Sequence, residues 1–383
     1  MPAKHKNQTS EKTGYNALRL PPLDALRGLI MVLMALDHAN HFIVQKPPPG
    51  EYWGGRFPIY HDALAFLTRL VTHLCAPGFF FLMGVGMVLF AHSRRKQGWS
   101  EWAIIRHFLI RGGLVIALQL LVVNRAWELS AGGWGLDIYI GVLFALGGTM
   151  ILGSLLLWLK PKVLLGLTAV LVLGTELLIP DLHLWNQVFQ PLSRLLLVPG
   201  GNPELWVNYP VLPWLELVIL GMVFGHWLVD DSQKAFERAL KLGGAFILAF
   251  LVLRYLDGFG NIRPRGGNTW IDFLNVVKYP PSITFNLLTM GVNLIIVGLF
   301  ARASKRLQQY FQPLVVFGQV PLFFYLTHLF LYAGLGLWLT PGGTSIPKMV
   351  PYWLLGLLIL FPLCLWYGQL KHRQLANSIL RFF

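Results

Sequence analysis

Long apolar stretches recur along this chain, and most of them are separated by short polar connections. Ten are long enough to cross a membrane, near residues 23–45, 66–91, 106–124, 136–159, 163–180, 211–229, 241–257, 282–301, 313–339 and 350–369. A transmembrane helix needs about 20 mostly apolar residues. The pattern therefore predicts an all-α fold, a polytopic integral membrane bundle of about ten transmembrane helices in contact with membrane lipid.

The composition excludes several other classes of protein. Of the 383 residues, 55% are hydrophobic and only 13% are charged, whereas about a quarter of the residues of an average soluble domain are charged. A soluble enzyme and a disordered chain are both excluded. Cys75 and Cys364 both lie within apolar stretches and form no CxxC pair, so a disulfide scaffold is excluded too.

The net charge of +14 indicates the orientation of the chain rather than nucleic-acid binding. Cytoplasmic loops of membrane proteins carry an excess of lysine and arginine. With the N-terminus inside, about two thirds of the 31 basic residues fall on the cytoplasmic side. We therefore predict a multi-pass inner-membrane protein, N-in and C-in. A cytoplasmic tail (1–19) would precede the transmembrane domain (20–370), and a second tail (371–383) would follow it.

The first predicted span contains charged and polar residues where charge is costly. Arg27 and His38 are eleven residues apart, which is three helical turns and about 20°, or roughly 16 Å along the axis. They therefore share one face. Charged residues inside a span normally face the protein interior and are usually functional. The alternative is an interfacial Arg27 that reaches the lipid headgroups, with His38 bonded to a neighbouring helix.

These residues also carry a resemblance to known families. Arginine, ten residues and then histidine in the first span resembles the signature of the membrane acyltransferase-3 group. The sequence LDALRG at 23–28 resembles the opening of the DUF1624 proteins, bacterial relatives of heparan-α-glucosaminide N-acetyltransferase. Further similar segments follow in the same order: PGFFFLMG at 77–84, Pro213-Trp214 with Gly221 and Gly225, KYPPS at 278–282 and FGQVPLFFY at 317–325. The resemblance covers about residues 19–369.

The resemblance implies an acyl-CoA-dependent transmembrane acyltransferase. It would move an acyl group, expected to be acetyl, from cytoplasmic acetyl-CoA to an amine or hydroxyl of an extracytoplasmic acceptor such as an envelope glycan. Arg27, Arg106 and Arg111 would hold the phosphates of coenzyme A, because a guanidinium binds phosphate through paired hydrogen bonds. His38 would act as general base. No metal is expected. The sequence does not define the oligomeric state, and a homodimer is compatible with it.

Four further polar residues are predicted to line the substrate cavity: His73, Lys278, Gln319 and His328. Gln319 lies beside Pro321, which predicts a kink where freed backbone carbonyls face a cavity. Trp134 and Trp206 are interpreted, together with Trp53 and Trp185, as an interfacial aromatic belt.

Three alternatives remain open at this stage. The animal glucosaminide acetyltransferases have asparagine at the position of His38 and a catalytic histidine in the following loop, so His61 is the second candidate for the base. Their Gly-Val-Leu-Gln-Arg segment reads GVLFA at 141–145 here, which argues against heparan as the acceptor. A metal site at His38, His41, His61, Asp62 and His73 is a minor hypothesis. A transporter or flippase without transfer activity is the rival function, although the sequence shows no repeat symmetry.

Overall fold

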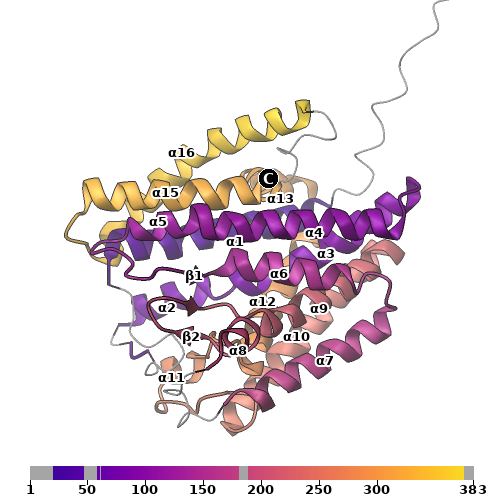
Figure 1. Ribbon diagram of the computed structural model, residues 1–383, viewed down its shortest axis with the longest axis horizontal. Helices are drawn as coiled ribbons and strands as arrows, with labels where there is room; N and C mark the ends of the chain where they lie inside the picture. Colours follow the sequence, from indigo (N-terminus) through magenta and orange to yellow (C-terminus); the bar gives the residue numbers. More distant parts are fainter. Residues whose placement is uncertain (1–19, 47–57, 61, 181–188, 375–383) are drawn as a thin grey trace, which may run out of the picture.

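The computed structural model describes residues 20–46, 58–60, 62–180 and 189–374. The helices run side by side as one bundle, and three short strands lie at one end of it (Figure 1). The first half contains α1 (Pro21–Ala39), η1 (Asn40–Val44), α2 (Ala63–Thr72), α3 (Cys75–Lys96), α4 (Glu101–Leu118), η2 (Gln119–Val123), α5 (Asn124–Glu128), α6 (Val142–Ser154) and α7 (Pro161–Leu178). The second half contains α8 (Pro191–Leu196), α9 (Val211–Asp230), α10 (Ser232–Leu256), α11 (Trp270–Leu274), α12 (Ile283–Arg302), α13 (Lys305–Tyr310), α14 (Gln312–Gln319), α15 (Pro321–Leu339) and α16 (Ile346–Arg373).

The all-α, polytopic membrane architecture is confirmed. Among the described residues, eight helical segments are long and apolar enough to cross a membrane: 63–96, 101–128, 161–178, 211–230, 232–256, 283–302, 321–339 and 346–371. The other two predicted spans correspond to α1 with η1, which has polar residues at both ends, and to α6, which has only 13 residues.

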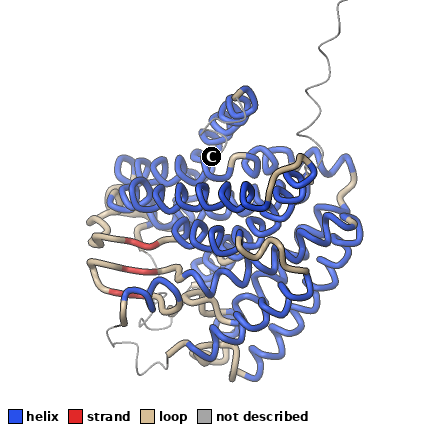
Figure 2. The backbone as a smooth tube through the Cα atoms, turned by 45° about the vertical axis from the view of Figure 1, so that its right-hand side comes forward, coloured by secondary structure: helices blue, strands red, loops and turns tan. Residues whose placement is uncertain are grey.

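The span predicted at 136–159 begins too early. Residues 139–140 form strand β1 (Tyr139–Ile140), which pairs in parallel with β3 (Trp206–Val207), and β3 pairs antiparallel with β2 (Gly200–Gly201). The preceding glycines Gly132, Gly133 and Gly135 have positive φ, a conformation that does not continue a helix. Figure 2 shows these strands among the loops at one end of the bundle, which we call the strand end.

Prolines interrupt two of the predicted spans. A proline ring clashes with the carbonyl four residues earlier, and the helix turns at His73 and Leu74, just before Pro77. The kink predicted at Gln319 is also present, because α14 ends there and α15 begins at Pro321. The Gly318 carbonyl at this break accepts a hydrogen bond from Arg27 Nη1 at 2.9 Å.

Glycines allow α1 to pack directly against α14 at that point. A β-carbon on Gly28 would overlap the carbonyl of Leu314, and one on Gly318 would overlap the carbonyl of Asp24. Without these β-carbons the two backbones touch. This contact brings Arg27 within reach of the broken end of α14.

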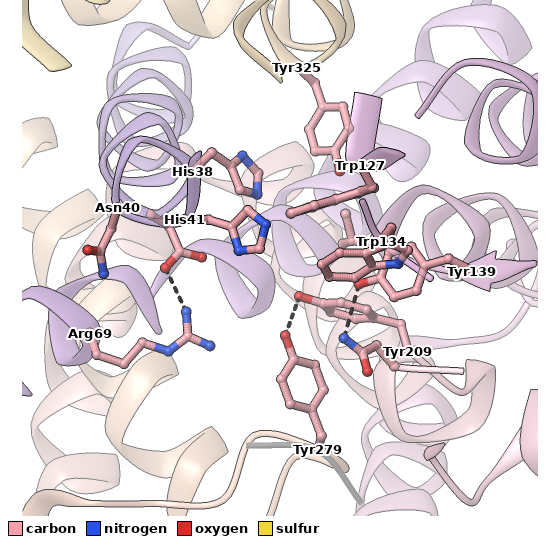
Figure 3. Close-up of a pocket in the computed structure, with 13 residues that line it drawn as sticks. His38, Asn40, His41, Arg69, Trp127, Trp134, Tyr139, Tyr209, Tyr279 and Tyr325 are labelled. Atoms are coloured by element: carbon pink, nitrogen blue, oxygen red, sulfur yellow. Dashed lines mark hydrogen bonds and ion pairs between the residues drawn. The ribbon is translucent and has the colours of Figure 1, made fainter. Parts of the chain in front are cut away.

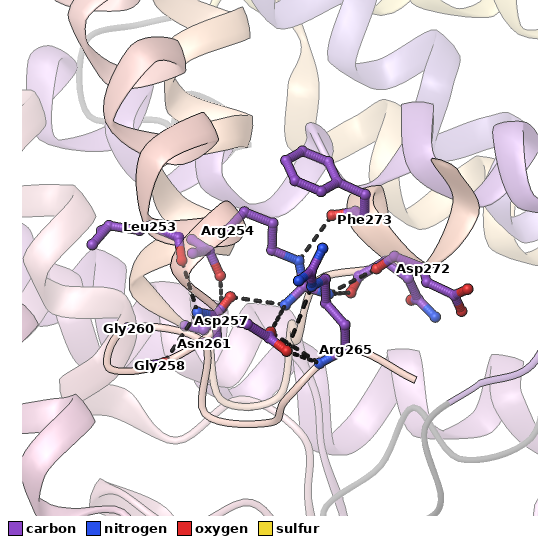
Figure 4. A network of polar contacts seen from close by, with 12 residues as sticks. Leu253, Arg254, Asp257, Gly258, Gly260, Asn261, Arg265, Asp272 and Phe273 are labelled. Carbon is purple, nitrogen blue, oxygen red and sulfur yellow. Dashed lines mark hydrogen bonds and ion pairs between the residues drawn. The ribbon is translucent and has the colours of Figure 1, made fainter. Parts of the chain in front are cut away.

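Arg254 organises the loop that follows α10 at the strand end (Figure 4). Its side chain is 1% exposed. The guanidinium donates to Asn261 Oδ1 and to the carbonyls of Phe273, Asp272 and Asn275 at 2.7–2.9 Å. One buried side chain therefore holds together both ends of the segment that leads to Lys278 and Tyr279.

We expect Arg254→Ala to destabilise the protein strongly, because it leaves several buried acceptors without their donor. Each buried acceptor left unsatisfied costs about 1–3 kcal/mol. The thermal unfolding midpoint of the purified protein in detergent should fall by several degrees. Arg302→Ala, at the exposed end of α12, is the matched control and should leave the midpoint unchanged. Equal midpoints for both variants would contradict this role of Arg254.

Candidate active site

A cavity of about 110 Å³ opens beside His38 near the strand end of the bundle (Figure 3). We call it the histidine cavity. Its lining residues come from six separate parts of the chain and are mostly polar or aromatic: Asp37, His38, Asn40, His41, Arg69, Trp127, Trp134, Tyr139, Val142, Asn208, Tyr209, Tyr279 and Tyr325.

The end of α1 and the turn that follows it supply the two histidines of this cavity. The helix changes to the π-helical turn η1 at Asn40, directly after the last α-helical residues, and such turns are frequent at functional sites. His38 Nδ1 lies 2.6 Å from His328 Nε2, and His41 Nε2 lies 3.1 Å from Ser130 Oγ. Both rings meet the indole of Trp127 edge to face, with centroids 5.4 Å and 4.9 Å away.

An aromatic wall faces the histidines. Trp127 and Trp134 pack with their centroids 4.8 Å apart, and Tyr139 meets both edge to face. Trp134, predicted from the sequence to lie in an interfacial belt, is therefore part of this wall. A second π-helical turn, η2, lies directly before α5, the helix that carries Trp127.

Three hydrogen-bonded pairs join side chains of the cavity lining, and one of them is Asn208 Nδ2 donating to the hydroxyl of Tyr139 at 3.0 Å. Arg69 Nη1 donates to Asp37 Oδ1 at 2.6 Å, and Tyr279 donates to the hydroxyl of Tyr209 at 3.1 Å. Burial raises the pKa of Tyr209 well above its ordinary value, and neighbouring Tyr279 adds to the effect, so the Tyr209 phenol is neutral at physiological pH. The ammonium of Lys278 lies over the rings of Tyr279 and Tyr209, 5.0 Å and 5.7 Å from their centroids.

A second cavity, of about 350 Å³, lies further along α1 beside Arg27. We call it the arginine cavity. Three cationic residues line it: Arg27, Arg111 and Lys371. Most of its other lining residues are apolar, and four of them are the methionines Met31, Met83, Met87 and Met150. Flexible methionine side chains adapt to an elongated apolar ligand.

The two cavities meet at two side chains. Val142, the first residue of α6, and Tyr325 of α15 line both of them. Arg27 lines one cavity and His38 the other, as expected from their place on one face of the first helix. Val142 and Tyr325 therefore form the wall that the two cavities share.

The other predicted site residues divide into two groups. Gln319 lines the arginine cavity, and His328 is buried behind His38. Arg106 is exposed and is not part of the arginine cavity's lining. His73 is buried against Phe285 and does not line the histidine cavity. His61, the second candidate for the base, lies outside the described residues, as do Trp53 and Trp185.

Several lining residues were not predicted from the sequence. Lys371, assigned to the C-terminal tail, lies in α16 and lines the arginine cavity with Arg27. Tyr279 and Tyr325 stand inside the segments 278–282 and 317–325 that carry the family resemblance, and that was the available signal for them. Trp127 and Tyr209 have no such signal. Within the described ranges, no group of three or more His, Cys, Asp or Glu residues could hold a metal ion.

Comparison with protein families gives one match to these elements. Residues 19–253 match the model of the family described as heparan-alpha-glucosaminide N-acetyltransferase, catalytic. The matched segment includes Arg27, His38 and Arg111 and ends within α10, before Lys278 and His328. No curated protein matches the chain. This match, together with the membrane-spanning helices, supports membrane N-acetyltransferase activity in general.

Proposed function

Since the chain belongs to the heparan-alpha-glucosaminide N-acetyltransferase catalytic family, we propose that it transfers an acyl group, acetyl in the first instance, from acyl-CoA to an extracytoplasmic acceptor. The observation that carries this proposal is the meeting of the two cavities at Val142 and Tyr325. One cavity carries cationic groups suited to a polyanion, and the other carries a histidine suited to general-base catalysis.

The arginine cavity is the donor site in this proposal. Arg27, Arg111 and Lys371 bind the phosphates of coenzyme A, and guanidinium groups do so through paired hydrogen bonds. The methionine-rich wall accommodates the pantetheine arm. The excess of basic residues predicted for this side supports the proposal that this end of the bundle faces the cytoplasm across an inner membrane, where acyl-CoA is available.

The histidine cavity is the acceptor site. His38 takes the proton of the incoming amine or hydroxyl, because neutral imidazole is an effective base near neutral pH. The aromatic wall of Trp127, Trp134 and Tyr139 offers faces for a sugar ring, and Asp37 and Arg69 offer polar contacts. We infer an amine or hydroxyl of an envelope glycan as the acceptor, with no metal and no nucleic acid involved.

The decisive experiment is a transfer assay on the purified protein in detergent. With radiolabelled acetyl-CoA and amino sugars, label should pass to the sugar at a rate proportional to protein concentration. Surface glycans of a deletion strain should lack an acetyl group by mass spectrometry. Sugar transport by proteoliposomes without acetyl transfer would instead support the rival function, a transporter or flippase.

We expect Arg27→Lys to weaken acetyl-CoA binding by about ten- to a hundredfold, because a lysine cannot form the paired bonds of a guanidinium with phosphate. This magnitude corresponds to a charged hydrogen bond of about 1.5–3 kcal/mol. Isothermal titration of the purified variant with acetyl-CoA measures the effect. Arg106→Lys is the control and should bind normally, because Arg106 is exposed and is not part of the cavity lining.

An unchanged affinity in Arg27→Lys would contradict the donor-site assignment. Arg27 would then serve only to join α1 to α14, through its 2.9 Å bond to the Gly318 carbonyl, while Asp24 Oδ1 of the same helix holds the guanidinium at 2.9 Å.

A further inference from the structure

His328 is a buried histidine with two defined hydrogen-bonding partners. It lies on α15 and is 0% exposed. Its Nδ1 lies 2.9 Å from the carbonyl oxygen of Phe324, and its Nε2 lies 2.6 Å from Nδ1 of His38. The two imidazole rings are inclined by only 27° to each other, with centroids 4.9 Å apart, as expected for a hydrogen bond in the common plane of the rings.

These partners determine where the protons are. A carbonyl oxygen only accepts hydrogen bonds, so Nδ1 of His328 must carry a hydrogen. In a neutral imidazole the other nitrogen is then an acceptor, so Nε2 of His328 accepts. Nδ1 of His38 must therefore donate, and the lone pair of neutral His38 is on Nε2. His38 lines the histidine cavity, so this lone pair belongs to the ring that faces the acceptor site.

We propose that His328 is the positioning residue of His38: it fixes His38 in the Nδ1–H tautomer, so that Nε2 is the base. This inference rests on the proposed function only for its catalytic consequence. The Phe324 carbonyl orients His328 through one hydrogen bond, and His328 orients His38 through the next. A hydrogen-bonded carboxylate orients a catalytic histidine in the same way. Here a neutral imidazole and a helix carbonyl take the place of the carboxylate.

The reaction balances with this arrangement. Nε2 of His38 takes the proton from the amine or hydroxyl of the acceptor, and the acceptor's nitrogen or oxygen bonds to the thioester carbonyl carbon. The carbon–sulfur bond then breaks, and the coenzyme A thiolate leaves and receives the proton from Nε2. Throughout, Nδ1–H of His38 stays bonded to Nε2 of His328, which supports the positive charge that His38 carries between the two proton transfers.

Two substitutions of His328 separate its two hydrogen bonds. In His328→Gln the side-chain oxygen can accept from His38, at the position that Nε2 occupies. In His328→Asn the shorter amide can still donate to the Phe324 carbonyl but cannot reach His38. We expect the Gln variant to keep kcat within about tenfold of the wild type. The Asn variant should lose on the order of 10²- to 10⁴-fold in kcat, with the KM for acetyl-CoA unchanged in both.

Nitrogen-15 NMR of histidine-labelled protein reads the tautomer without any activity. The His38 signals, identified by their loss in His38→Ala, should show the Nδ1–H tautomer in the wild type and in His328→Gln, but not in His328→Asn. An Nε2–H tautomer in the wild type, or equal kcat values for the Gln and Asn variants, would overturn the inference. A wild-type protein that transfers no acyl group would overturn the proposed function, while the NMR result would still test the tautomer.

Discussion

His38→Ala should abolish nearly all acyl transfer while leaving acetyl-CoA binding intact. Loss of a general base typically costs on the order of 10²- to 10⁴-fold in rate. The donor is expected to be anchored at Arg27, roughly 16 Å away along the same helix, in a cavity that His38 does not line. The effect of His38 on the transfer rate can therefore be separated from the effect of Arg27 on donor binding. Steady-state transfer rates and a direct acetyl-CoA titration on the same preparation measure the two effects.

His61→Ala is the informative companion variant. If His38 is the base, His61→Ala should have the smaller effect on the transfer rate. The reverse order would give the role of base to the loop histidine, as in the animal enzymes. If neither variant loses activity while both remain folded, the acyltransferase assignment fails for this chain.

Val142→Trp should stop transfer by closing the junction between the two cavities. Val142 lines both of them, and an indole at this position would occupy the path proposed for the donor thioester toward His38. Misplacement of reacting groups by about 1 Å costs on the order of 10²-fold in rate, so we expect a loss of at least about this size. The measurement is again kcat, with acetyl-CoA affinity as the second readout.

Two control variants show whether a loss of activity comes from closure or from misfolding. Val163→Trp places the same bulk on an exposed position of α7 and should leave activity unchanged. Val142→Ala widens the junction and should retain transfer. Full activity in Val142→Trp would show that acceptor and donor meet elsewhere. The proposal that they react where the two cavities meet would then be wrong.

The helices could be predicted from the sequence because each depends on local chemistry. Apolar stretches of sufficient length require helices in a bilayer, since every backbone polar group must be bonded within the segment. Proline at 321 predicted the break at Gln319, because the residue before a proline disfavours helical geometry. The common face of Arg27 and His38 followed from helical periodicity, and the two residues do line cavities that meet.

The error at 136–159 shows where local reasoning ends. Tyr139 and Ile140 are apolar enough to continue a helix, but they pair with Trp206 and Val207, some 67 residues later in the chain. No local pattern indicates this pairing. The extended segment places Tyr139 in the aromatic wall, so the same non-local contact that shortens α6 also completes the cavity.

The sequence by itself determined the membrane class, the helical periodicity and the placement of an arginine and a histidine on one helix face. These follow from length, hydropathy and spacing, which are properties of neighbouring residues. Only the tertiary structure decided what surrounds them. It brought Lys371 from the last helix to the arginine cavity. It also brought Trp127 and Tyr209 to the histidine cavity, and Nε2 of His328 to 2.6 Å from Nδ1 of His38. The physical reason is that these contacts join residues tens to hundreds of positions apart, and packing between helices, not spacing along the chain, sets such distances.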